Sequence, residues 1–306
     1  MIRVRFLGTA AARPTVSRNV AGIAVQREGQ SFLWDCGEGT QRQIMRFGTG
    51  FSFRHVFITH AHADHFLGLP GLLRTMGLQG REEPLFIYGP KGSEAVLSQA
   101  VHLGVKATPF PVEVLPLQGG GVVDFGDWRV EAFPVSHGIP ALGYALVERA
   151  RLGRFDVNRA RELGVPEGPM FGRLHRGETV EIDGRQVRPE DLVGPPRPGR
   201  RLVYAGDCRP GATTAEAARG ADLLIHEATF TAEEEDRARE TRHSTAAEAA
   251  DVARQAEVRS LAMTHISARY GELPKVLEAE ARAVFKESRV AFDGLELEIP
   301  YRVGAE

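Results

Sequence analysis

A six-residue segment, His60-Ala61-His62-Ala63-Asp64-His65, constrains this chain more than any other feature of its sequence. It directly follows residues 56–59, whose apolar run has the pattern of a buried strand. Four side chains able to bind a metal ion therefore lie together where a strand gives way to a loop. Three imidazoles and a carboxylate packed so closely would repel and desolvate one another unless a cation compensated. The segment predicts a metal site, and its neutral imidazoles favour zinc.

Six residues cannot complete two tetrahedral sites, so we expect further ligands at other strand ends. His137, Asp207 and His265 each follow an apolar, strand-like run and have a small residue beside them. A carboxylate at Asp207 could bridge two ions, because it has two oxygens. We interpret the remaining histidines outside this pattern as ordinary packed or surface residues; they include His55, His102, His175 and His226.

The composition is that of a globular protein. The 306 residues are 42% hydrophobic and 25% charged, which excludes disordered and fibrous classes. No apolar run approaches the roughly 18 residues of a membrane span, and the N-terminus has the pattern of a strand, so we expect a cytoplasmic protein with no membrane contact. The two cysteines, Cys36 and Cys208, are too few for a disulfide framework, and we expect buried, reduced thiols.

The hydrophobic pattern predicts a layered α/β fold, with two sheets between outer helices. Short alternating runs in the first 60 residues indicate a hairpin-rich sheet, and later strands are interspersed with helices. The predicted strands are residues 2–7, 22–26, 31–35, 56–59, 85–88, 128–134, 142–147, 202–205, 223–225 and 260–263, and the predicted helices are residues 92–103, 214–219, 244–256 and 274–285.

Residues 148–201 interrupt this pattern. They contain twelve arginines against nine acidic residues, with six prolines and eight glycines, whereas the whole chain has a net charge of −2. We therefore predict a single domain over residues 1–306 with an inserted basic arm at about 150–200. Such an arm suits contact with a polyanion, but a solvated loop excursion would have the same composition. The residues alone do not separate these two interpretations.

Several motifs together resemble the metallo-β-lactamase superfamily and, within it, the ribonuclease Z family. His60-x-His62-x-Asp64-His65 combines with Ser136-His137-Gly138, Gly206-Asp207 and Thr264-His265 in the superfamily's pattern. The motifs that are similar to ribonuclease Z are Pro14-Thr15-Val16-Ser17-Arg18-Asn19, Gly168-Pro169-Met170-Phe171-Gly172-Arg173-Leu174, His226-Glu227-Ala228-Thr229-Phe230, Arg242-His243-Ser244-Thr245 and His265-Ile266-Ser267-Ala268-Arg269-Tyr270. Two positions depart from the family: Val16 replaces a lysine, and Cys208 replaces a threonine.

The resemblance implies a four-layer αβ/βα sandwich with a dinuclear site on one edge and a tRNA-binding arm. It implies two zinc ions per subunit, and it makes Asp64 the residue that takes or orients a water proton and His243 the proton donor. His243 has a plainer interpretation as a neighbour of a helix cap at Ser244 or Thr245. In the implied metal assignment, His60, His62 and His137 hold one ion, Asp64, His65 and His265 hold the other, and Asp207 lies between them.

The activity that the resemblance implies is endonucleolytic removal of the 3′ trailer from precursor tRNA. Cleavage after the discriminator nucleotide would leave a tRNA 3′-hydroxyl and a trailer 5′-phosphate, and the enzyme would be a homodimer. The alternatives are a phosphodiesterase for a small cyclic or nucleotide substrate, a di-iron redox protein and a non-catalytic RNA-binding protein. The basic arm argues against an enzyme for small substrates. The imidazole of His62 argues against a di-iron protein, and the complete set of ligands argues against a non-catalytic protein.

Overall fold

The computed structural model describes residues 1–271 and 273–302, which form two compact units. The main unit consists of Met1–Val147 and Arg201–Pro300. The inserted unit consists, in the described part of the chain, of residues 148–200 and 301–302.

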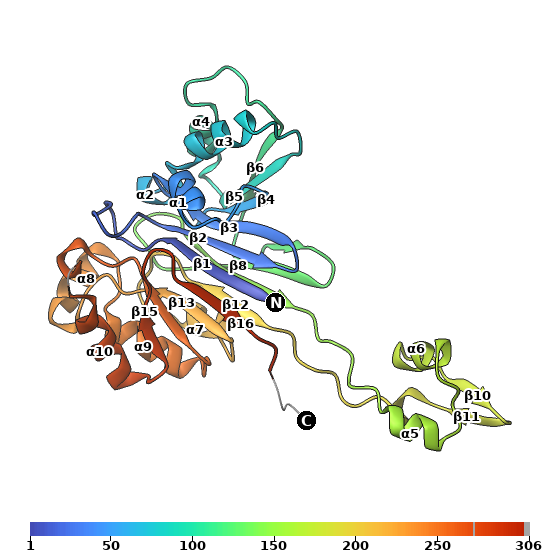
Figure 1. The fold of residues 1–306 in the computed structure, drawn as a ribbon. Helices are drawn as coiled ribbons and strands as arrows, with labels where there is room; N and C mark the ends of the chain where they lie inside the picture. Colours follow the sequence, from blue (N-terminus) through green and yellow to red (C-terminus); the bar gives the residue numbers. More distant parts are fainter. Residues whose placement is uncertain (272, 303–306) are drawn as a thin grey trace. The chain divides into compact units, whose positions relative to one another are not determined.

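Two seven-stranded mixed sheets form the centre of the main unit (Figure 1). Strands β3 to β6 pair in parallel in the first sheet, and β12 to β15 pair in parallel in the second. The first sheet has the order β16 (Glu296–Ile299), β1 (Ile2–Gly8), β2 (Gly22–Arg27), β3 (Gln30–Cys36), β4 (Phe53–Phe57), β5 (Leu85–Pro90) and β6 (Val112–Leu117). The second has the order β15 (Ser288–Val290), β14 (Leu261–Thr264), β13 (Leu223–Glu227), β12 (Arg201–Tyr204), β9 (Leu142–Glu148), β8 (Trp128–Pro134) and β7 (Val122–Asp124).

Helices cover the outer face of each sheet. The first sheet is associated with α1 (Thr40–Arg46), α2 (Ala63–Phe66), α3 (Leu69–Leu78) and α4 (Glu94–His102), and the second with α7 (Ala212–Ala217), α8 (Glu235–Thr241), α9 (Ala246–Gln255) and α10 (Pro274–Val284). The short 3-10 helices Ala232–Glu234 and Ala268–Tyr270 lie in the connections. The outcome is the predicted four-layer α/β sandwich. Among the described helices, none combines the length and the apolar character that crossing a bilayer requires.

Aromatic side chains fill the layer between the two sheets. Phe32 of the first sheet stacks on Trp128 of the second with ring centroids 5.6 Å apart, and Trp34 stacks on Tyr204 at 5.7 Å. Burying each large apolar side chain contributes about 1.5–3 kcal/mol, so this layer fixes how the sheets face each other. A second hydrophobic core lies between the first sheet and its helices, and a third lies between the second sheet and its helices. The sheets therefore hold their strand ends in fixed positions.

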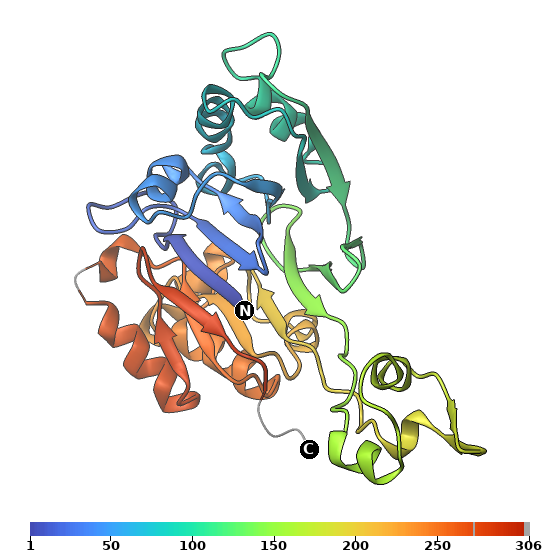
Figure 2. The same cartoon turned by 45° about the vertical axis from the view of Figure 1, so that its right-hand side comes forward.

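The inserted unit has a small fold of its own, shown in green to yellow in Figure 2. Asp156 caps α5 by accepting a hydrogen bond from the Arg159 amide, and Pro169 begins α6 at a position that needs no amide donor. Six buried apolar side chains form its core, so the segment is not a solvated loop. Its elements are α5 (Val157–Glu162), α6 (Pro169–His175), the hairpin β10 (Val180–Ile182) with β11 (Arg185–Val187), and the 3-10 helix Pro189–Asp191.

The two chain segments at the base of the inserted unit are held together by arginine contacts. The guanidinium of Arg200 makes two hydrogen bonds to the buried carboxylate of Glu148, at 2.8 and 2.7 Å. The guanidinium carbons of Arg200 and Arg151 lie 3.8 and 3.5 Å from the ring centroid of Tyr301. Backbone hydrogen bonds between Arg151 and Arg197 close the pair of segments.

Candidate metal centre and active site

The predicted ligands come from loops at the carboxyl ends of strands in both sheets. His60 and His62 follow β4, and Asp64 and His65 lie on the one-turn helix α2. His137, Asp207 and His265 follow β8, β12 and β14. Strands β12 and β14 run parallel with β13 between them, so the loops after them lie at the same edge of the second sheet. The loops after β4 and β8 reach the same rim. The structure brings together all seven of the predicted ligands.

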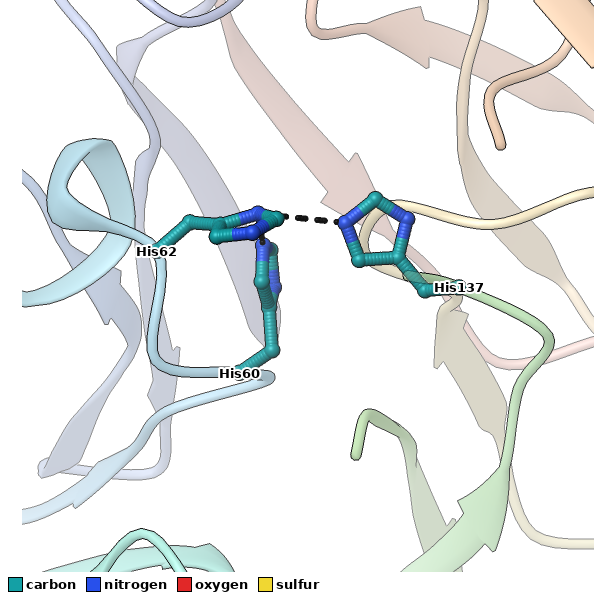
Figure 3. A group of neighbouring side chains, drawn as sticks. All are labelled: His60, His62 and His137. Carbon is teal, nitrogen blue, oxygen red and sulfur yellow. Dashed lines mark hydrogen bonds between the residues drawn. The ribbon is translucent and has the colours of Figure 1, made fainter. Parts of the chain in front are cut away.

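The first ligand group consists of three histidines, His60, His62 and His137 (Figure 3). His62 Nδ1 lies 3.0 Å from His60 Nε2 and 3.2 Å from His137 Nε2. Nitrogen ligands at 2.0–2.1 Å from a tetrahedral zinc ion would be about 3.3 Å apart. The three nitrogens therefore have the spacing of ligands around one cation.

The second ligand group consists of Asp64, His65 and His265. Asp64 Oδ2 lies 3.5 Å from His65 Nε2 and 3.4 Å from His265 Nε2. Asp207 Oδ2 lies 3.3 Å from His65 Nε2, 3.1 Å from His265 Nε2 and 3.7 Å from His60 Nε2. Asp207 thus reaches members of both groups, which is the position of a bridging carboxylate.

Burial and neighbouring charges shift the pKa values of this cluster, and at its two carboxylates the two effects oppose each other. Burial disfavours the charged form of Asp207, but His265 and His65 outweigh it and hold the pKa of Asp207 well below its ordinary value. Burial also opposes ionisation of Asp64, but hydrogen bonding to His265 and His65 lowers the pKa of Asp64 in the same way. Burial, and then the neighbouring His65, lowers the pKa of His60 well below 6.5. The cluster therefore contains ionised carboxylates beside a neutral imidazole, the forms in which these groups bind metals.

Two atoms show that the cluster fits a metal ion. Among the described residues, His65 Nε2 and Asp207 Oδ1 are buried side-chain atoms without a hydrogen-bond partner. Leaving buried polar atoms unpaired is costly, and a cation bound by Asp64, His65 and Asp207 would give His65 Nε2 a partner. Five imidazoles and two carboxylates form a donor set that suits zinc. The side chains present are therefore compatible with divalent cations at this site.

A glycine allows the segment that carries Asp207 to approach Thr59, two residues after β4. Gly206 has φ +64°, and a Cβ atom there would lie 2.8 Å from Cγ2 of Thr59. Any other residue would be strained and would push Asp207 away from the histidines. His265 also has a left-handed backbone, with φ +56°, which is uncommon for a residue with a side chain.

His243 lies beside the cluster and is held by a buried carboxylate. Its Nδ1 donates to Glu227 Oε1 at 2.8 Å, and its ring centroid is 5.1 Å from that of His265. The same carboxylate accepts hydrogen bonds from the Cys208 amide, the Ser244 amide and the Thr229 hydroxyl. Burial disfavours the charged ring, but Glu227 outweighs it and raises the pKa of His243 to about 9.

The helix cap next to His243 is Thr245. Its hydroxyl accepts a hydrogen bond from the Glu248 amide, and the Glu248 carboxylate accepts one from the Thr245 amide, which forms a capping box. Arg209 donates to this carboxylate and to the carbonyl of His243. The loop that carries His243 is thereby tied both to α9 and to the segment after Asp207.

Two carboxylates of this site are not predicted as functional residues by the sequence pattern. Glu227 belongs to a family motif, and its position at the end of β13 is the signal that could have found it. Asp35 has the pattern of the last residue of a strand, but it accepts a hydrogen bond from His65 Nδ1 at 2.8 Å. His226 is a packed residue, as expected; it is buried and its Nδ1 donates to a backbone carbonyl. Cys36 and Cys208 are buried and free, as predicted.

The loop of residues 14–19 is anchored beside the cluster. Buried Arg18 donates to the Thr9 hydroxyl at 2.7 Å and to the Ala291 carbonyl at 2.6 Å. Just before the loop, the Ala12 amide donates to Asp64 Oδ2 at 3.0 Å. The side chain of Val16, in contrast, is fully exposed. The loop is therefore fixed at its base and presents position 16 to solvent.

The fold and this site define a member of the metallo-β-lactamase superfamily. The family model "Metallo-beta-lactamase superfamily" matches residues 18–151, and the model "Beta-lactamase superfamily domain" matches residues 192–266. Together these matches include every predicted metal ligand.

Comparison with individual proteins identifies the family to which the chain belongs within this superfamily. The chain is 54% identical to the ribonuclease Z of Myxococcus xanthus over 99% of both chains, and 54% identical to that of Gemmatimonas aurantiaca over 97% of this chain and 95% of the relative. The crystal structure of human tRNase Z, short form, superimposes with a TM-score of 0.70 at 29% identity, covering 97% of this chain and 99% of the human one. The chain belongs to the ribonuclease Z family.

Proposed function

We propose that this chain is a metal-dependent endoribonuclease that removes the 3′ trailer from precursor tRNA. The observation that carries the proposal is the convergence of seven ligand side chains in a chain 54% identical to a ribonuclease Z over 99% of its length. The cut falls after the discriminator nucleotide. The bond between phosphorus and the 3′-oxygen breaks, and a water oxygen bonds to phosphorus. The products are a tRNA with a 3′-hydroxyl and a trailer with a 5′-phosphate.

The proposal includes two zinc ions per subunit. His60, His62 and His137 would hold one, the second ligand group would hold the other, and Asp207 would lie between them. A pair of bound divalent cations supplies Lewis-acid polarisation of a phosphodiester and lowers the pKa of an attacking water. Metal analysis of protein purified without added metal tests the identity of the ions; iron in place of zinc would favour redox chemistry.

Asp64 is proposed to accept or orient the proton of the attacking water, in addition to its ligand role. Its carboxylate is ionised, and the Ala12 amide fixes the direction of Oδ2. A carboxylate at hydrogen-bonding distance from the water can serve as the base of the reaction.

His243 is proposed to donate the proton to the leaving 3′-oxygen. Its Nδ1 donates to Glu227, which leaves Nε2 as the nitrogen that faces a substrate. The ring is only partly buried, with 17% of the side chain exposed, so a substrate oxygen can reach it. The Glu227 carboxylate stabilises the protonated ring and fixes its orientation. General-acid catalysis of this kind is typically worth about 10²–10⁴-fold.

The inserted unit is proposed to be the arm that grips the tRNA. Its arginines are largely exposed, and several form surface ion pairs within the unit, such as Arg159 with Glu162 and Arg173 with Glu178. Exposed ion pairs contribute little to stability, so these arginines can exchange a glutamate for a phosphate at low cost.

We also propose a cytoplasmic homodimer in which the arm of one subunit holds the tRNA that the other subunit cuts. Two inactive variants test this arrangement: one lacks the arm, and the other carries Asp64→Ala. Mixing them under subunit-exchange conditions should restore cleavage, because one subunit supplies an intact arm and the other an intact site. A monomer by light scattering, or a mixture that stays inactive, would contradict the dimer.

The decisive experiment for the function is cleavage of a 3′-extended precursor tRNA with the cut mapped to the nucleotide. Wild-type protein should cut once, after the discriminator. Asp64→Ala should abolish cleavage while binding of the precursor persists, and Asp236→Ala, at a fully exposed carboxylate, is the control. Near wild-type cleavage by Asp64→Ala would overturn the assignment of this residue.

A further inference from the structure

A buried carboxylate outside the ligand set connects the two ligand groups. Asp35 is at the end of β3 and is fully buried. Its Oδ2 accepts a hydrogen bond from Nδ1 of His65 at 2.8 Å. The Thr59 hydroxyl lies 3.0 Å from the same oxygen, and Nδ1 of His60 lies 3.0 Å from that hydroxyl. Asp35 therefore contacts one histidine directly and a second through a threonine.

The hydrogen-bond directions in this chain of contacts are determined by chemistry. A carboxylate only accepts, so the single hydroxyl proton of Thr59 points to Asp35. The Thr59 oxygen can then only accept from His60, which places the proton of that ring on Nδ1. His65 likewise carries its proton on Nδ1. When each ring is neutral, as metal binding requires, its Nε2 carries no proton, and Nε2 is the atom that lies beside the other ligands of its group.

We infer that Asp35 is a positioning residue for both ions at once, because it orients His65 of the second ligand group directly and His60 of the first through Thr59. This inference rests on the proposed metal-dependent function. Thr59 serves mainly the first ion, because its hydroxyl lies 3.0 Å from Nδ1 of His60 but 3.4 Å from Nδ1 of His65, whose shorter contact is with Asp35. The second ion depends on the direct hydrogen bond between Asp35 and His65.

The surroundings of Asp35 show that its carboxylate is fixed. The backbone amide of Thr59 donates to Oδ1 at 2.7 Å, and the hydroxyl of Tyr204 donates to Oδ2 at 2.7 Å. Asp35 has φ +56°, a left-handed conformation that costs about 1 kcal/mol or more and that Asp and Asn adopt more readily than other residues with side chains. Four donors to one buried carboxylate hold it against this strain and against the cost of its burial.

A comparable arrangement supports the other side of the site. Glu227 accepts directly from His243, and the Thr229 hydroxyl donates to Glu227 at 2.6 Å while lying 3.0 Å from Nδ1 of His265. In each case a buried carboxylate serves one ring directly and another through a threonine. The difference is that both rings served by Asp35 are metal ligands.

Three substitutions test the inference in the full-length protein. Asp35→Asn keeps the size and the left-handed conformation, but it removes the negative charge, and its amide nitrogen cannot accept a hydrogen bond. Donors contact both carboxylate oxygens, so the nitrogen would face either the Thr59 amide or His65 Nδ1, and the remaining neutral oxygen would orient the two branches more weakly. Thr59→Val removes the branch to His60 at nearly constant volume. Tyr204→Phe is the matched control, because it removes a buried donor to Asp35 without removing a partner of either histidine.

The measurement is the number of zinc ions retained per subunit during equilibration against increasing concentrations of a chelator. Asp35→Asn should release both ions at about 10–100-fold lower chelator concentration than wild type. Thr59→Val should release one ion early and retain the other. Tyr204→Phe should differ little from wild type. The midpoint temperature of thermal unfolding, measured on metal-free protein, should be similar for Asp35→Asn and Tyr204→Phe. A general loss of folding in Asp35→Asn would instead lower its midpoint well below that of Tyr204→Phe.

The outcomes separate this inference from the proposed function. If wild-type protein retains no zinc, the proposed metal dependence fails. If wild type binds two ions and Asp35→Asn holds both at the wild-type chelator concentration, only the role of Asp35 fails. Should Asp35→Asn not fold, Thr59→Val decides, because release of both ions together or of neither would contradict the separate branch to His60.

Discussion

Nδ1 of His243 lies 2.8 Å from Oε1 of Glu227, and this contact places a buried carboxylate behind an imidazole at the edge of the ligand cluster. Burial opposes ionisation of Glu227, but His243 outweighs it and lowers the pKa of Glu227. The two side chains form a charged pair whose exposed end is the imidazole. If this pair protonates the leaving oxygen, both members must act in the same step.

The first prediction concerns that pair. His243→Ala should lower the single-turnover cleavage rate of precursor tRNA by about 10²–10⁴-fold, and Glu227→Gln should also lower it. The double variant should be no slower than His243→Ala, because residues that act as one unit are non-additive. Glu240→Gln, at an exposed position nearby, is the control.

The same variants separate an acid role from a structural one. Hydrolysis of bis(p-nitrophenyl) phosphate releases an anion that needs no proton, so His243→Ala should leave its rate within a few fold of wild type. A loss as large as that on precursor tRNA would remove His243 from the acid role.

The second prediction concerns the inserted unit. Residues 154–196 can be replaced by a short Gly-Ser linker, because the backbone pair of Arg151 and Arg197 already joins the two segments. Precursor tRNA should bind more weakly, and the slope of log Kd against log salt should become shallower by about 0.9 for each phosphate that the shortened protein no longer neutralises. Hydrolysis of bis(p-nitrophenyl) phosphate should be unchanged, because the unit has its own core.

Equal losses on both substrates would show that the inserted unit supports the fold of the metal site rather than RNA binding. Unchanged tRNA binding would favour an enzyme for small phosphodiesters.

The third prediction concerns Val16, which is fully exposed on the loop anchored beside Asp64. Val16→Lys adds a cation where the family carries one, so precursor tRNA should bind more tightly and the salt slope should steepen by about 1. The cleavage rate at saturating enzyme should stay the same. Val16→Gln is the neutral control, and an equal effect of both substitutions would exclude a charge contact.

The fourth prediction concerns the pH dependence of stability. His55 on β4 packs against Phe86 and Phe125, with ring centroids 5.4 and 4.8 Å away. Burial, and then the charge of Arg54, lowers the pKa of His55 to about 4, whereas the unfolded value is about 6.5. The unfolded chain therefore binds more protons in this range, and stability is lost as the pH falls from about 6.5 to 4.

His55→Phe removes this titration and keeps the aromatic packing. Its free energy of unfolding, measured in urea on metal-free protein, should fall less than that of wild type between pH 7 and pH 4.5. Parallel pH profiles for the two proteins would show that His55 does not contribute.

Much of the fold could be predicted because hydrophobic periodicity is local. Residues 246–255 and 274–284 are amphipathic and rich in helix formers, and both are helices. The helix α3 is absent from the predicted elements because Pro70 and Gly71 weaken the local signal, although its buried leucines follow the helical repeat. The strand β6 is absent from them because it contains Pro116 at the edge of a sheet.

The sequence by itself determined which side chains can form the site, because histidines and aspartates at strand ends are recognisable from their immediate neighbours. Only the tertiary structure decided how they are supported. Asp35 and His65 are 30 residues apart, and Glu227 and His243 are 16 apart, and neither pair shares a helix or a strand. Their contacts depend on which strands and connections lie side by side, as β3 and β4 do, and on left-handed residues such as Asp35. Local periodicity contains no information about these contacts, because they are made between chain segments that meet only in the folded protein.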